Sequence, residues 1–182
     1  MVDELTMGLL ASAESGGGFN GRRSALAALQ RVEHERVWLA ADRPRALFDV
    51  QGIEADRLRA SPAARTPLWT GPRRCMIVAD ICTAEALAAD LASLPETAMV
   101  TDVSHAWVRL TVGGPGARDL LRSGISVELE PETWPVGYAA QTAYRDIQVL
   151  LHATEPECFH LYTFRSLGLS LWQWLDDAAM TV

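Results

Sequence analysis

The spacing of apolar residues predicts a chain of short strands with a few helices between them. From Ala106 to Val112 every second residue is apolar, which is the period of a strand that buries one face. Continuous or alternating apolar runs predict further strands at 36–40, 46–50, 67–72, 75–81, 99–103, 138–144, 147–152 and 159–164. The last three strands follow closely on one another, and Arg145-Asp146 is expected to turn a hairpin between the first two.

Two segments have the period of a helix instead. In Thr83–Leu94, Leu87, Leu91 and Leu94 recur at helical spacing, and Pro95 is expected to end the helix. A terminal helix is predicted from Ser166, a suitable N-cap, to Ala179, with leucines every four residues along one stripe. Shorter helices are expected at 24–32 and after the turn Gly113–Gly116. The mixture predicts an α+β fold with mixed or antiparallel sheets and few helices.

The domain organisation follows from length and from the glycine-rich start. Residues 1–24 contain Ser15-Gly16-Gly17-Gly18 and show no sustained apolar period, which predicts a flexible N-terminal arm. The remaining residues, 25–182, suit a single α+β domain.

Charge and composition exclude several classes of function. The net charge of −7 argues against nucleic-acid binding, which needs a basic surface. All 16 basic residues are arginine, so a Schiff base and a phosphate-loop lysine are excluded. No apolar run is long enough to cross a membrane, and the acidic start argues against a secretory signal. Three cysteines without a metal or redox spacing are expected to be buried free thiols in a reducing cytoplasm.

Each candidate for chemistry has a simpler structural interpretation. The Gly113–Gly116 turn lacks a dinucleotide fingerprint, and the three carboxylates of the acidic, Pro-bounded segment 125–136 (Glu128, Glu130, Glu132) have no histidine nearby in sequence. The four histidines (34, 105, 152 and 160) are scattered, and none stands in a known nucleophile motif. We therefore expect no catalytic residue, no cofactor site and no metal site in this chain.

The terminal helix is apolar around more of its circumference than one buried face requires, so it is expected to be either deeply buried or shared with another chain. Six tryptophans in 182 residues support contact with another chain, because tryptophan is enriched at interface hot spots. The predicted subunit interface consists of Trp134, Arg165, Leu169, Trp172 and Trp174.

An ordered series of short motifs resembles the gamma subunit of heterotetrameric sarcosine oxidase. The series contains the segment 108–121 (VRLTVGGPGARDLL), then Leu129-x-Pro131 and Pro135-Val-Gly137, then 146–152 (DIQVLLH), and finally Arg165-Ser166 before Leu171-Trp172-x-Trp174-Leu175. The resemblance covers roughly residues 66–178. Ile125, Glu128 and Phe164 stand where that family often has Cys, Asp and Pro, which favours a relative acting on another N-methylated amine.

The resemblance implies a fold like part of the aminomethyltransferase-like folate-binding fold. It also implies a non-catalytic gamma subunit beside alpha, beta and delta-like subunits, which together oxidatively demethylate a methylated amine and transfer one carbon to tetrahydrofolate. FAD, a dinucleotide, tetrahydrofolate and zinc would all be bound by those partner subunits. Two alternatives stay open: a stand-alone folate-dependent one-carbon transferase, and an unrelated protein-binding module.

Overall fold

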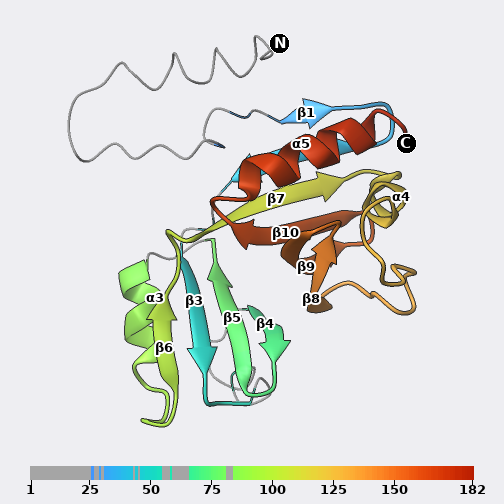
Figure 1. The fold of residues 1–182 in the computed structure, drawn as a ribbon. Helices are drawn as coiled ribbons and strands as arrows, with labels where there is room; N and C mark the ends of the chain where they lie inside the picture. The colour runs from blue at the N-terminus through green and yellow to red at the C-terminus, as the bar shows by residue number, and fades with distance from the viewer. Residues whose placement is uncertain are drawn as a thin grey trace, which may run out of the picture.

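The structure, a computed structural model, describes residues 31–42, 46–54, 66–80 and 84–182, together with Leu26, Leu29, Pro44 and Leu58. These residues form two antiparallel sheets with three helices, as Figure 1 shows. The predicted α+β class is therefore confirmed. The arm predicted over residues 1–24 lies outside the described residues.

The larger sheet has six strands in the order β1-β2-β7-β10-β9-β8. Along the chain these are β1 (Val32–Glu33), β2 (Trp38–Asp42), β7 (Trp107–Gly113), β8 (Ala139–Tyr144), β9 (Ile147–Glu155) and β10 (Cys158–Phe164). The terminal helix α5 (Gly168–Ala179) packs against β2 and β7, and the short helix α4 (Ala117–Arg122) packs against α5. The predicted hairpin is confirmed, because β8 and β9 pair directly on either side of Arg145-Asp146.

The smaller sheet has four strands in the order β4-β5-β3-β6. Its strands are β3 (Ala46–Gln51), β4 (Thr66–Gly71), β5 (Arg74–Ala79) and β6 (Met99–Asp102), and helix α3 (Ala84–Leu91) packs on one face. The leucine stripe predicted for this helix is confirmed in part, because Leu87 and Leu91 are buried against the sheet while Leu94 lies beyond the end of the helix.

The core divides according to which face of each sheet it covers. In β7 the predicted stripe Val108, Leu110 and Val112 is fully buried under α4 and α5, in the largest apolar cluster. A second cluster lies between the smaller sheet and α3. A third joins the two sheets through Leu47, Leu68, Met76 and Val78 on the smaller one and Ala139, Leu150 and Tyr162 on the larger one. The sheets are therefore packed on each other by side chains.

The turn from β7 into α4 needs glycine for steric reasons. Gly114 has a φ of +110°, and a Cβ atom on Gly113 would lie 2.2 Å from ring atoms of Trp38. The glycines therefore allow a tight strand-to-helix turn. This agrees with the structural interpretation of the segment, which lacks a dinucleotide-binding fingerprint.

Two further predicted helix boundaries are wrong, besides that of α3, which ends at Leu91 rather than at Leu94. Val32 belongs to strand β1 and pairs with Leu39 of β2, so the helix predicted over 24–32 does not reach its expected end. The terminal helix begins at Gly168 rather than Ser166, and its N-cap is Leu167, whose side chain makes no capping hydrogen bond. Tertiary packing on β2 and β7 holds this helix instead of a capping side chain.

Candidate functional site

A polar cluster lies where the two sheets meet, on the face of β7 that α5 does not cover. Its centre is Arg109, whose side chain is only 9% exposed. Arg109 donates from Nε and Nη2 to the two carboxylate oxygens of Asp42, at 2.7 and 2.6 Å. Its Nη1 donates to both oxygens of Asp80, at 2.9 Å each. One buried guanidinium thus binds two carboxylates.

The elements that supply these three residues explain the role of the cluster. Asp42 ends β2 and is the direct antiparallel partner of Arg109 on β7, so strand register places the two together. Asp80 follows β5 of the smaller sheet. Arg109 therefore connects the two sheets electrostatically, beside the apolar cluster that joins them through packing.

Three further polar residues line the same face of the larger sheet. His152 on β9 and His160 on β10 are direct cross-strand partners, with ring centroids 6.1 Å apart. Tyr162 is 2% exposed, and its hydroxyl is 3.3 Å from Nδ1 of His160. We call these residues, with Arg109, Asp42 and Asp80, the Arg109 cluster.

Burial and the charge of Arg109 set the protonation states in the cluster. Burial, together with the neighbouring Arg109 charge, lowers the pKa of His160 to about 4 and also lowers the pKa of His152. Burial raises the pKa of Tyr162 to about 12. Burial alone would lower the pKa of Arg109, but its hydrogen bonds to Asp42 and Asp80 outweigh this and raise it. Near neutral pH the cluster therefore consists of an arginine cation, its two carboxylates, two neutral imidazoles and a neutral phenol.

One polar atom in this cluster has no partner. Nδ1 of His152 is buried, and it has no hydrogen-bond partner among the described residues. Over the same part of the chain, no group of three or more His, Cys, Asp or Glu side chains is arranged to hold a metal ion. The cluster has the composition of an inter-sheet connection, in which each charge meets an opposite charge at hydrogen-bonding distance.

The interface residues predicted from the sequence fall into two groups. Trp134 and Trp172 are each only 5% exposed and belong to the core of this chain, which leaves little of either side chain for a partner. Arg165 is exposed, while Leu169 and Trp174 are partly buried. The apolar excess of α5 is therefore largely accounted for by packing within the chain itself.

The histidine pair was not predicted, because the four histidines looked scattered along the chain. Regular pairing outward from Glu155 and Cys158 would place His152 opposite Leu161, and only the register shift between Cys158 and Phe159 makes His152 and His160 direct partners, so the sequence alone did not indicate the pair. His105, another of the four histidines, follows Ser104, whose hydroxyl takes part in the fold. Ser104 Oγ is 2.9 Å from the backbone nitrogen of Leu47, from which it accepts a hydrogen bond, and His105 lies exposed in a turn before β7.

The free thiols are only partly as predicted. Cys75 is buried, and burial raises the pKa of its thiol to about 11, which makes it a poor nucleophile. Cys158 is free but partly exposed, so the prediction of burial is wrong there. Cys82 lies outside the described residues. Among the described helices, none has the length and hydropathy to cross a membrane.

Known proteins resemble this chain in sequence and in fold. A family model described as the sarcosine oxidase gamma subunit family matches residues 78–181. A chain of heterotetrameric sarcosine oxidase from Corynebacterium sp. U-96, solved in complex with pyrrole 2-carboxylate, has 25% sequence identity and a TM-score of 0.72. That match covers 87% of this chain and 94% of the Corynebacterium chain. No curated protein sequence matches this chain.

Proposed function

Because this chain belongs to the sarcosine oxidase gamma subunit family, we propose that it is the gamma subunit of a heterotetrameric sarcosine oxidase-like complex. The observation that carries the proposal is the extent of the structural likeness, which covers 94% of a chain from such a heterotetramer. A chain that keeps the fold of one subunit over nearly its whole length is suited to occupy the same place in an assembly.

The reaction of the complex is also part of the proposal. The complex oxidatively demethylates an N-methylated amine and transfers the one-carbon unit to tetrahydrofolate. Alpha, beta and delta-like subunits bind FAD, a dinucleotide, tetrahydrofolate and zinc, and this chain supports them without taking part in the chemistry. The motif series from Val108 to Leu175 supports this assignment, as does the likeness to the Corynebacterium enzyme. We place the complex in the cytoplasm.

The Arg109 cluster supports a scaffolding role for this chain. The guanidinium of Arg109 is already bound by two carboxylates, so its charge serves the connection between the sheets. His160 is neutral near pH 7, because its pKa is lowered to about 4, and it therefore makes a weak general base. These properties suit a rigid subunit whose surface, rather than its interior, meets the partners.

Reconstitution tests the proposal. The three partner subunits are co-expressed with and without this chain, and oxidation of N-methylated amines is followed with a dye acceptor and by formaldehyde release. We expect the complex that contains this chain to be active, and the three remaining subunits to assemble poorly and lose most of the activity. A three-subunit complex with full activity and stability would contradict the proposal, as would amine oxidation or folate-dependent transfer by this chain alone.

A further inference from the structure

The loop of residues 126–138 is held rigidly although it contains no helix or strand. Its two inward residues are Leu129, which is fully buried, and Trp134, which is 5% exposed. From beneath the loop the guanidinium of Arg118 donates hydrogen bonds to the carbonyl oxygens of Leu129, Trp134 and Pro156. One arginine therefore fixes both halves of the loop to the body of the chain.

Two further contacts fix the middle of the 126–138 loop. The hydroxyl of Thr133 donates to the carbonyl oxygens of Glu128 and Glu130, at 3.3 and 3.1 Å. The carboxylate of Glu130 forms an ion pair with Arg122 of α4. A long loop without secondary structure that is held this firmly is more typical of a binding loop than of a simple connection.

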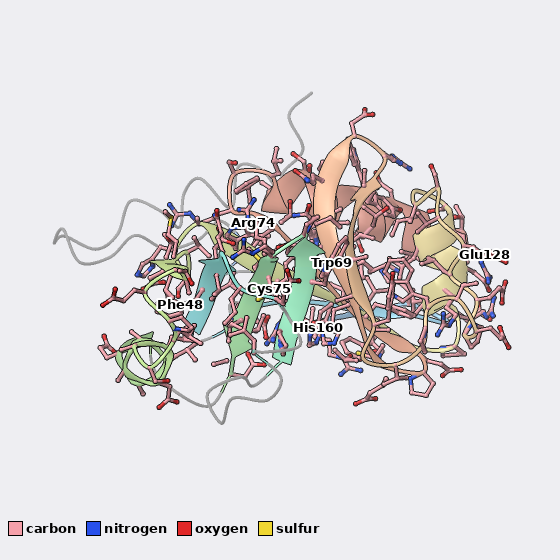
Figure 2. All side chains as sticks on the ribbon, turned by 90° about the horizontal axis from the view of Figure 1, so that it is seen from below. Phe48, Trp69, Arg74, Cys75, Glu128 and His160 are labelled. Atoms are coloured by element: carbon pink, nitrogen blue, oxygen red, sulfur yellow. The ribbon has the colours of Figure 1, made fainter. Side chains whose placement is uncertain are left out.

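The outward side of this loop combines apolar side chains with free carboxylates. Val127, Val136 and Tyr138 are 39%, 52% and 45% exposed, which is high for side chains of this size. Glu128 and Glu132 are exposed and have no cationic partner among the described residues, whereas Glu130 between them is neutralised by Arg122. Figure 2 shows Glu128 at the end of the molecule opposite Phe48 of the smaller sheet.

A buried donor in the same loop is also unsatisfied. The indole Nε1 of Trp134 is buried and has no acceptor within the described residues, although its ring packs edge-on against Tyr138 at 4.8 Å. An unpaired buried donor costs free energy in the isolated chain. The arrangement is thus incomplete at the position where the loop exposes its apolar side chains.

From these observations, and resting on the proposed function, we propose that the 126–138 loop docks onto a partner subunit of the complex. The partner surface has an apolar hollow for Val136 and Tyr138, with Arg or Lys at its rim to pair with Glu128 and Glu132. The charges argue against a second copy of this chain. A two-fold contact would bring the same unpaired carboxylates face to face, on a chain whose net charge is −7.

Binding of loop variants to the co-expressed partner subunits tests this inference. We expect Val136→Ser with Tyr138→Ser to weaken binding by about 30-fold or more, because exposed aromatic and aliphatic anchors dominate such contacts. Glu128→Arg with Glu132→Arg is expected to weaken binding by roughly 10-fold and to reduce its dependence on salt. All four positions are exposed, so the far-UV circular dichroism of the free chain should not change, and its melting temperature should fall only slightly, through the edge-on contact with Trp134 that Tyr138→Ser removes.

Matched controls come from β6 of the smaller sheet and the turn before it, away from the loop. Glu96, in the turn before β6, is exposed without a cation partner among the described residues, and Met99 of β6 is 64% exposed, so Glu96→Arg and Met99→Ser make equivalent changes elsewhere. We expect both controls to bind like the wild type. Loop variants that bind as tightly as the wild type would overturn the inference while leaving the proposed function in place. A wild-type chain that binds no partner subunit would count against the proposed function itself. If the free chain forms a dimer and the loop variants abolish it, the loop binds a second copy of this chain rather than a partner subunit, and the inference is overturned.

Discussion

The two faces of β7 differ in how they hold the molecule together. On one face Val108, Leu110 and Val112 are fully buried against helices, in an apolar cluster that runs through the larger sheet. On the other face Arg109 meets Asp42 and Asp80 at the junction of the two sheets. The apolar face contributes stability through the area it removes from water, whereas the polar face depends on direction and register. The comparison teaches that one strand can both build a core and set the position of a second sheet.

The largest effect is expected on the apolar face. Leu110→Ala removes a fully buried side chain from the centre of the sheet, so we expect the free energy of unfolding to fall by about 3 kcal/mol. Urea denaturation followed by circular dichroism measures it. A loss below about 1 kcal/mol would mean that the core collapses around the missing side chain, and that this face is less tightly packed than described.

A smaller but more specific effect is expected on the polar face. Arg109→Met leaves Asp42 and Asp80 without their cation, but both carboxylates are about half exposed and regain water. We therefore expect the free energy of unfolding to fall by roughly 2 kcal/mol, which is at or below the low end of the range for breaking a buried ion pair. Adding Asp42→Asn and Asp80→Asn should recover part of that loss in the same urea measurement. Purely additive losses would contradict the coupling of the three residues.

The pH dependence of stability should also come from the polar face. The pKa of His160 is lowered to about 4 in the folded chain, from the ordinary histidine value of 6.5. Between these values the unfolded chain binds more protons, so stability increases with pH through this window and is lost as the pH falls from 6.5 to 4. We expect the free energy of unfolding to fall by an amount on the order of 2 kcal/mol across this window. In His160→Gln the fall should be smaller. Urea titrations at several pH values measure the slope. An unchanged slope in this variant would show that His160 does not carry the effect.

Much of the fold could be predicted because it is encoded locally. The period of two in β7, the hairpin about Arg145-Asp146 and the leucine spacing of α3 each depend on residues close together in the chain. The terminal helix was also predicted, but its apolar circumference could not distinguish burial within the chain from contact with another chain. Of the residues proposed for a subunit interface, Trp172 packs in the core of this chain, which the sequence pattern alone did not distinguish from a partner contact.

The Arg109 cluster could not be predicted for a physical reason. Arg109 is 67 residues from Asp42 and 29 from Asp80, and the three meet only through the register of β2 on β7 and the packing of two sheets. A shift of one residue in that register would place these side chains on opposite faces. The role proposed for the 126–138 loop could not be predicted from the acidic segment 125–136 for a similar reason. Its apolar exposure becomes visible only once Leu129 and Trp134 are known to point inward.

The central claim is that this chain is one subunit of a four-subunit complex, and native mass spectrometry tests it most directly. The chain is co-expressed with its alpha, beta and delta-like partners and purified through a tag on the alpha-like subunit. The account predicts one assembly whose mass includes this chain together with all three partners. Recovery of the three partners as a stable complex without this chain, and of this chain as a free monomer, would contradict it.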